Sequence, residues 1–183
     1  MSCDIANGLA EPCKTQVGGL DAIYIINYGD YAYPNDFTFD ATYPDMIDDI
    51  NGVANVYKFE LKGANSFEQT ITSSRDNGTT FVEQTLTVNL KGQSAVKHKL
   101  VKLLAYGRPH IIVRTRANQY FLAGLERGMD LTTGVISNGT AMGDMNGYTL
   151  TFVGQENIAA NMLDCSTEAG LVTLLSNATI VTS

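Results

Sequence analysis

The sequence predicts a mainly β protein: an antiparallel β-barrel or sandwich with one flanking α-helix, at about residues 94–106, and a long loop, at about residues 28–51. Three observations support this prediction. Two stretches that alternate apolar and polar residues flank Asn77-Gly78, a dipeptide typical of tight β-turns. Other short stretches alternate in the same way, and only one has a helical period. At 183 residues, the chain is most simply one domain over residues 1–183, with an extended N-terminal arm and a C-terminal tail.

The element around which the chain is organised is a long hairpin over residues 67–90. A type I′ turn at Asn77-Gly78 would place Phe67 opposite Val88 and Gln69 opposite Leu86. Because side chains alternate between the two faces of a strand, one face is mostly apolar, interrupted by Gln69 and Gln84. This face is expected to point inward. The opposite face carries Glu68, Thr70, Thr72, Glu83, Thr85 and Thr87. It is too polar to bury without many partners, so we expect it to line a water-filled lumen.

The other elements follow from residue periodicity along the chain. Strands are predicted at residues 21–27, 53–61, 110–115, 119–125 and 148–153. The third and fourth of these form a second hairpin. A further short strand is possible at residues 135–136, whereas residues 171–175 and 180–181 fit a strand and a helix equally well. We therefore expect six to eight strands.

One helix is predicted between the two hairpins. Ser94 is a suitable N-cap, Gly107 a suitable end, and Pro109 prevents continuation. The helical period predicts that one face is buried, formed by Val96, Leu100, Leu103 and Leu104.

Residues 28–51 break every periodic pattern. They combine prolines, six aspartates and, beyond Tyr28, five aromatic residues, and a loop of this length is usually functional or disordered. The aromatic residues argue against disorder. Two interpretations remain open: a loop folded back on its own domain, or an arm that packs on a neighbouring subunit. The inter-subunit interpretation assigns contacts to Tyr31, Tyr33, Asp36, Phe37, Phe39, Asp40, Tyr43 and Asp45.

The charges are segregated along the chain, although the net charge is only −7. Residues 15–57 contain seven aspartates and no lysine or arginine, whereas residues 91–127 contain eight basic residues and one acidic residue. Residues 128–183 again contain acids and no base. The blocks either neutralise one another within the fold or meet between copies in a head-to-tail assembly. Nucleic-acid binding fits less well, because the basic block has few aromatic residues and the chain is acidic overall.

No catalytic constellation is recognisable, so we expect a protein that is not an enzyme and has no cofactor. His98 and His110 do not have metal-ligand spacing, and no phosphate-binding loop is present. Cys3 and Cys13 could form a disulfide, but thiols in a reducing compartment fit the three-cysteine chain better. No apolar run approaches the roughly 18 residues that cross a bilayer, so no membrane span is expected.

Three stretches of the chain together resemble a known family. Cys-Lys-x-x-Val-Gly-Gly precedes a Tyr-Ile-Ile strand at residues 13–26, the threonine-rich hairpin, the helix and the strand pair follow, and Asn-Gly-Tyr-Thr-Leu-Thr-Phe stands at residues 146–152. This layout, over residues 13–156, resembles small virion proteins of tailed phages and is similar to the tail-tube family, which contractile injection systems share. The departure is the length of the acidic, aromatic loop.

The resemblance implies a β domain with one flanking helix that forms hexameric rings. These rings would stack into a tube through which DNA passes without specific binding. The hairpin would line the tube, and residues 28–51 would reach the next ring. Partners would be further copies of the chain and other virion or tail proteins, with assembly in the host cytoplasm and a final place in the virion tail. Two alternatives remain: another phage part, such as a ring, collar or head-decoration protein, or a soluble ligand-binding β-barrel.

Overall fold

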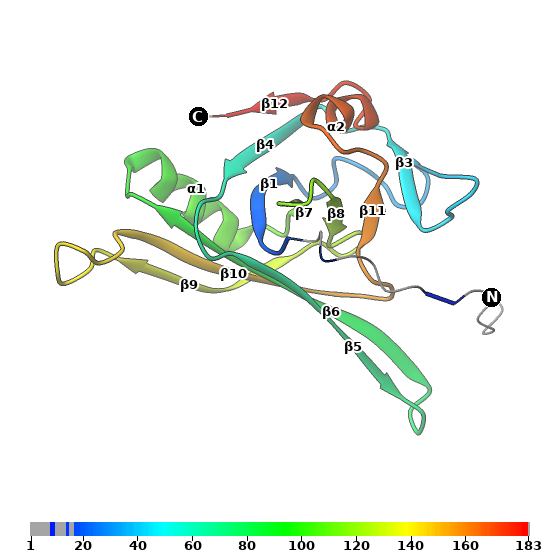
Figure 1. Cartoon of the computed structure of the whole chain (residues 1–183), viewed down its shortest axis with the longest axis horizontal. Coiled ribbons are helices and arrows are strands. Elements are labelled where there is room, and N and C mark those ends of the chain that lie inside the picture. The colour runs from blue at the N-terminus through cyan, green and yellow to red at the C-terminus, as the bar shows by residue number, and fades with distance from the viewer. Residues whose placement is uncertain (1–7, 10–13, 15–16, 183) are drawn as a thin grey trace.

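The computed structural model describes residues 8–9, 14 and 17–182, and it confirms a mainly β fold of two packed sheets (Figure 1). The larger sheet contains β1 (Leu20–Ile26), β2 (Phe37–Phe39), β3 (Met46–Ile50), β4 (Asn55–Glu60), β7 (His110–Thr115), β8 (Tyr120–Ala123), β11 (Asn161–Leu163) and β12 (Thr179–Val181). Their order is β12-β4-β1-β7-β8-β11-β3-β2, antiparallel except for the pairs β12-β4 and β11-β3. The smaller sheet contains β5 (Ser66–Ser74), β6 (Thr79–Lys91), β9 (Asp130–Ser137) and β10 (Gly147–Glu156). Its order is β5-β6-β10-β9, and the fold is a sandwich rather than a closed barrel.

The larger sheet is buried on both faces, which explains why residues 22–26 of β1 are apolar without interruption. One face packs against the smaller sheet, where Ile23, Ile111 and Val113 meet Leu86 and Phe152. The opposite face is covered by a second helix, α2 (Glu168–Leu174), whose Leu171 and Leu174 belong to the same apolar cluster as Ile47 and Ile50 of β3. Two apolar clusters therefore lie on either side of one central sheet.

The predicted helix is present as α1 (Ala95–Tyr106), with Ser94 as its N-cap, but only half of the predicted buried face packs inward: Leu104 lies against the core, and Leu100 is half-buried. Val101 is the buried residue, while Val96 and Leu103 are 57% and 59% exposed. Apolar residues surround most of this helix, so their spacing does not determine which stripe faces the sheet. A second helix, α2, occupies the stretch that fits a strand and a helix equally well by sequence, and β12 follows it.

The organising hairpin is confirmed, but its turn and register differ from the prediction. Ser74 pairs with Thr79, so four residues rather than two form the connection, and Phe67 lies opposite Leu86. Gly78 has a φ of 63°, whereas Asn77 does not have positive φ, which excludes a type I′ turn. The register shift is two residues, so every side chain keeps its predicted face.

The segment at residues 28–51 is not a structureless loop, because it contains β2 and β3. These strands are short and lie among prolines and aspartates, so the sequence shows no hydrophobic alternation there. β2 pairs with β3, and β3 pairs with β11, so contacts with distant residues determine these strands. Ile47 and Ile50 of β3 are fully buried. The short strand that the sequence allows at residues 135–136 is present as part of the eight-residue strand β9.

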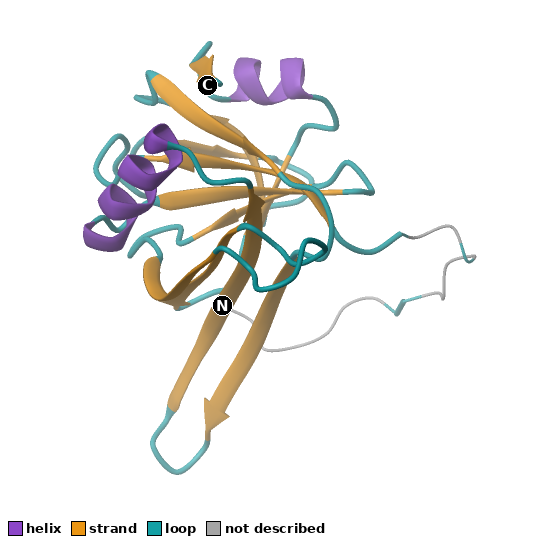
Figure 2. Ribbon diagram, turned by 90° about the vertical axis from the view of Figure 1, so that its left-hand side faces the viewer, coloured by secondary structure: helices purple, strands orange, loops and turns teal. Residues whose placement is uncertain are grey.

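The β5-β6 hairpin is longer than the body it packs on. Figure 2 shows the two strands projecting below the rest of the molecule, and Figure 1 shows α1 and β9 on the side opposite β3 and β11. Ile71, near the middle of β5, is 67% exposed although it lies on the inward face, because this part of the hairpin extends past the core.

Candidate functional site

The outer face of the smaller sheet is the most distinctive polar surface of the described chain. The strand registers align side chains in rows across all four strands. One row contains Ser66, Thr87, Thr151 and Thr133, and the next contains Glu68, Thr85, Val153 and Asp130. Neighbouring polar side chains are linked: Thr149 donates to Asn89 Oδ1 at 2.7 Å, and Gln155 donates to Glu83 Oε2 at 3.2 Å.

All six residues predicted to face a lumen lie on this outer face. Glu68, Thr70 and Thr72 of β5 are exposed, whereas Glu83, Thr85 and Thr87 of β6 are half-buried by their neighbours. None of the six belongs to either apolar cluster. That this face lines a water-filled lumen stays a prediction.

Two glutamines that interrupt the inward face have identifiable partners. Gln69 and Gln84 lie directly opposite each other. Gln84 is fully buried and accepts a hydrogen bond from Gly124 N at 2.8 Å, and Gln69 accepts one from Ala160 N at 2.7 Å. Each glutamine therefore joins the hairpin to a connection between the two sheets.

The connection at residues 124–128, between β8 and β9, is held by several buried polar groups. Besides Gln84, His110 Nδ1 bonds to the Gly124 carbonyl and Tyr31 donates to the Leu125 carbonyl at 3.0 Å. Glu156 accepts the backbone N–H groups of residues 126 and 127 at 3.0 and 2.8 Å. Burial raises the pKa of Glu156 and lowers the pKa of His110. No pattern in the sequence indicates this arrangement.

The aromatic residues of the 28–51 segment pack mainly on one another. The Tyr31 and Phe37 rings meet edge to face with centroids 4.9 Å apart, Tyr33 meets Phe37 in the same way at 5.4 Å, and Phe39 stacks on Phe37. Tyr31 is buried. Tyr33, Phe37 and Phe39 are half-buried against the apolar cluster on the face of the larger sheet that α2 covers. Tyr43 is exposed.

Of the three aspartates in this segment that were predicted to make inter-subunit contacts, two bond within the segment and one is exposed. Asp36 accepts from Ala32 N at 2.6 Å, and Asp40 accepts from the N–H groups of Thr42 and Tyr43 at 2.7 Å each, so both stabilise turns. Asp45 has an exposed side chain. Residues 41–45 are the longest exposed run of this segment and so the part best placed to contact another molecule, and the inter-subunit contact itself stays a prediction.

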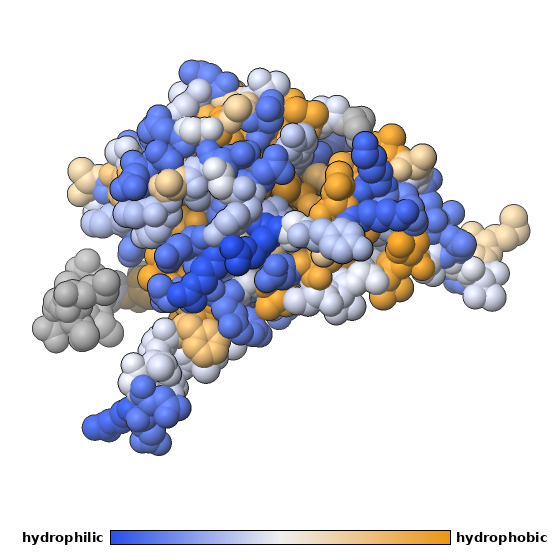
Figure 3. All heavy atoms as spheres, turned by 180° about the vertical axis from the view of Figure 1, so that it is seen from behind, coloured by the Kyte–Doolittle hydropathy of each residue, from blue (hydrophilic) through white to orange (hydrophobic). Residues whose placement is uncertain are grey.

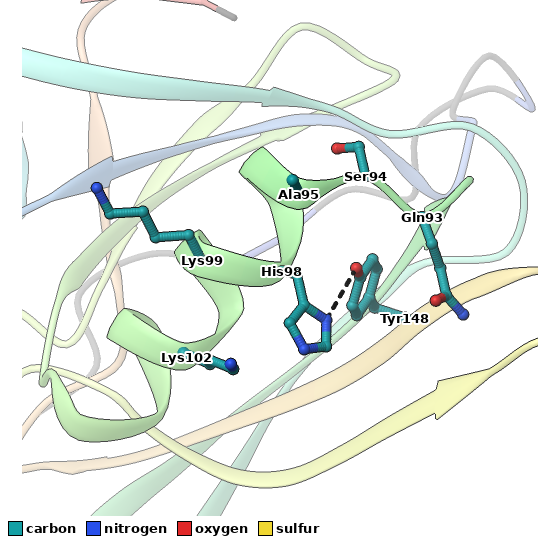
Figure 4. A pocket seen from close by; sticks show the side chains of 7 residues that line it. All are labelled: Gln93, Ser94, Ala95, His98, Lys99, Lys102 and Tyr148. Atoms are coloured by element: carbon teal, nitrogen blue, oxygen red, sulfur yellow. Dashed lines mark hydrogen bonds between the residues drawn. The ribbon is translucent and has the colours of Figure 1, made fainter.

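Two grooves lie on opposite sides of the molecule. The first, between α1 and β10, is lined by Gln93, Ser94, Ala95, His98, Lys99, Lys102 and Tyr148 (Figure 4). His98 and Tyr148 point toward each other, with 3.5 Å between Nδ1 and the hydroxyl oxygen. The second groove is lined by Tyr43, Asp45 and Met46 on one side and residues 158–162, leading into β11, on the other. The first groove has a basic rim, and the second is mostly apolar with one carboxylate.

A partly buried polar cluster fixes α2 to the larger sheet. Glu168 accepts from Lys58 Nζ at 2.6 Å and from the Tyr24 hydroxyl at 3.0 Å, and the Lys58 bond lowers the pKa of Glu168. Arg114 lies over the Tyr120 ring in the same region. Since both hydrogen bonds hold the Glu168 carboxylate against the sheet, the cluster acts as an anchor for the helix.

Within the described residues, no group of three or more histidine, cysteine or acidic side chains could hold a metal ion. Neither helix of this part of the chain is long and apolar enough to cross a membrane. Cys165 is a free, half-buried thiol whose pKa is raised to about 12, first by burial. Cys3 and Cys13, the candidate disulfide pair, lie outside the described residues.

Comparison of the chain with family models, with curated protein sequences and with solved structures finds no match.

Proposed function

We propose that the chain is a structural subunit that assembles with copies of itself into rings, hexameric as the family resemblance implies, which stack into a tube such as the tail tube of a phage. The observation that supports this proposal most strongly is the four-stranded sheet. It combines a polar outer face, two open edges and a hairpin that extends beyond the body of the molecule.

The two open edges favour lateral assembly. Within the described chain, β5 and β9 each have a sheet neighbour on one side only, and they are nine and eight residues long. An exposed edge of this length presents unpaired backbone groups to other chains. Pairing β9 of one copy with β5 of the next satisfies both edges. Such head-to-tail contacts generate a ring if the rotation closes.

The polar face then lines the interior of the ring. Its side chains are mainly threonines, with the carboxylates Glu68, Glu83 and Asp130. Acidic side chains repel the phosphate backbone, so DNA can pass without adsorbing. This role requires no cofactor and no catalytic group. The partners are further copies of the chain and other tail proteins, and the location is the virion tail after assembly in the host cytoplasm.

The projecting hairpin favours stacking of rings over a single ring. Its tip is hydrophilic, as Figure 3 shows at the end of the projection. The tip can therefore stay in water until a second ring binds to it. A collar, single ring or head-decoration protein uses the same lateral contacts without this stacking. A ligand-binding barrel fits less well, because the sheets do not close and apolar side chains fill the space between them.

The lateral contact is tested by placing a charge on the β5 edge. Ile71→Lys changes a side chain that is already 67% exposed, so the fold should be retained. We expect the variant to lose the high-mass species in sedimentation velocity, because a charged edge strand resists pairing. The matched control is Val181→Lys, on the edge strand β12 of the other sheet, which should sediment as the parent does. Equal sedimentation of Ile71→Lys and the parent would contradict pairing through β5.

A further inference from the structure

We propose that the exposed face of α1 docks into the groove between residues 43–46 and 158–162 of a second copy of the chain. This inference rests on the proposed assembly and specifies a contact outside the two edge strands. It assigns a role to an apolar surface that the isolated subunit leaves in water.

The outward face of α1 combines apolar and basic side chains. Val96 and Leu103 are one heptad apart and more than half exposed, and Tyr106 is almost fully exposed near the helix end. Lys99 and Lys102 are exposed and lie on the same side of the helix by its 3.6-residue period. Within the described chain, these three apolar side chains have no packing partner sufficient to cover them, which is costly in water.

The groove offers the complementary surface. Its walls include exposed apolar side chains from both segments: Tyr43, Ile158 and Met162. Asp45 lies in the lining, and Asp48 and Asp164 are exposed on β3 and just after β11. An apolar floor with an acidic border matches an apolar helix face flanked by lysines.

The charges make a second copy the fitting occupant. The groove segments belong to residues 15–57 and 128–183, which contain no lysine or arginine. Residues 91–125, which include α1, contain no acidic residue. The two surfaces therefore attract each other and repel their own kind, so the contact is head to tail rather than symmetric.

The placement of the two surfaces agrees with this geometry. Figure 1 shows α1 beside β9 on one side of the molecule and β3 with β11 on the other. Ala160 N bonds to Gln69 of β5, so the groove adjoins the β5 edge. Gln93, immediately before α1, bonds to Ser137 at the end of β9, so the helix adjoins the β9 edge. A copy that pairs β9 with β5 also brings α1 toward the groove.

Cross-linking tests the contact directly. In a chain carrying Cys3→Ser, Cys13→Ser and Cys165→Ser, which removes every native thiol, Leu103→Cys and Met162→Cys are introduced together, and a short bismaleimide is added to the assembled protein. We expect a ladder of covalent multimers, because each copy is joined to the next. A mixture of the two single variants should stop at dimers, and Leu103→Cys paired with Val181→Cys should give no ladder.

Three results would overturn the docking. A ladder of equal strength from the Val181→Cys pair would show only random collision, and a dimer formed by Leu103→Cys alone would show a symmetric contact. Absence of cross-links would show that α1 of one copy does not lie against this groove of the next. If high-mass species persist in sedimentation without cross-links, the docking fails and the proposed ring assembly stands.

A charge exchange provides an independent readout. Lys102→Glu should raise the apparent dissociation constant of assembly roughly tenfold, because it places like charges together. The matched control Lys62→Glu, exposed but distant in sequence, should leave it unchanged. Adding Asp45→Lys to Lys102→Glu should restore assembly. Failure of this rescue, with Asp45→Lys alone folded by circular dichroism, would contradict the proposed pairing.

Discussion

The Gly124 peptide shows how single buried residues join the two sheets. Its N–H donates to Gln84 of β6, and its carbonyl bonds to His110 of β7. Gly124 has a φ of 68°, and a Cβ there would lie 2.7 Å from the Gly128 carbonyl carbon, so another residue could not be accommodated without movement. These contacts join three distant segments, which is why no local sequence pattern indicates them.

The buried His110 should make the stability of the fold depend on pH. Burial lowers the pKa of His110 below its ordinary value, so the folded state binds fewer protons than the unfolded state. The stabilising contribution is present above the unfolded pKa of about 6.5 and is lost as the pH falls from there through the lower folded pKa. We expect the melting temperature to fall between pH 7.5 and pH 5.5.

His110→Asn should remove part of this fall, measured by thermal unfolding at both pH values, because a neutral donor near the same place does not titrate. The matched control is His98→Gln, which keeps His110 and should keep the fall seen in the parent. A fall of the same size in His110→Asn would show that other groups cause it.

Gln84 makes a prediction about buried hydrogen bonding. Gln84→Met keeps a side chain of similar size but leaves the Gly124 N–H without its partner, which should cost about 1–3 kcal/mol of unfolding free energy. The matched control is Gln155→Met on the exposed outer face, which should change it by less than about 0.5 kcal/mol. Chemical denaturation measures both. Equal stability of the two variants would contradict a net stabilising role for this hydrogen bond, because the unpartnered Gln84 Nε2 is lost with it.

At the scale of elements, the sequence predicted the strands and the helix that have a clear local pattern of apolar residues, turn residues or caps. The strand β1, the two hairpins and the bounds of α1 follow from alternation, turn residues and caps. The faces of the long hairpin were also predictable, because a register shift of two residues preserves them. Glu68, Thr85 and their neighbours therefore share the face that alternation assigns to them, although nothing in the sequence indicates the rows that β9 and β10 add.

The elements that the sequence did not predict depend on tertiary contacts. Strands β2 and β3 are only three and five residues long and lie between prolines and aspartates. They pair with partners that periodicity does not identify, as β3 does with β11. The buried stripe of α1 is set by where the helix meets the sandwich. The spacing of apolar residues along the sequence does not indicate the strand partners of β2 and β3 or the side of α1 that is buried.

The hairpin turn supports a prediction at this scale. Gly78→Val forces a β-branched residue to a φ of 63°, and no atom lies within 4 Å of the added Cβ, so the cost is conformational alone. We expect a loss of about 1–3 kcal/mol. Asn77→Ala, which has no positive φ to maintain, is the control and should cost less. Calorimetry that finds equal melting temperatures would place the strain elsewhere in the turn.

At the scale of the whole molecule, two opposite sides carry complementary surfaces. One side presents β9 and the basic, apolar face of α1, and the other presents β5 and, beside it, the mostly apolar groove that contains Asp45. The smaller sheet between them carries the polar face, and the hairpin extends from one end. In the proposed head-to-tail assembly, the exposed apolar residues of α1 are buried against the next copy.

The most direct test of head-to-tail ring assembly is negative-stain electron microscopy of the purified chain over a range of concentrations. We expect rings with a stain-filled centre, and stacks of such rings at higher concentration, seen in side views as striated tubes. Particles that remain single subunits at every concentration, with a melting transition confirming that they are folded, would contradict it.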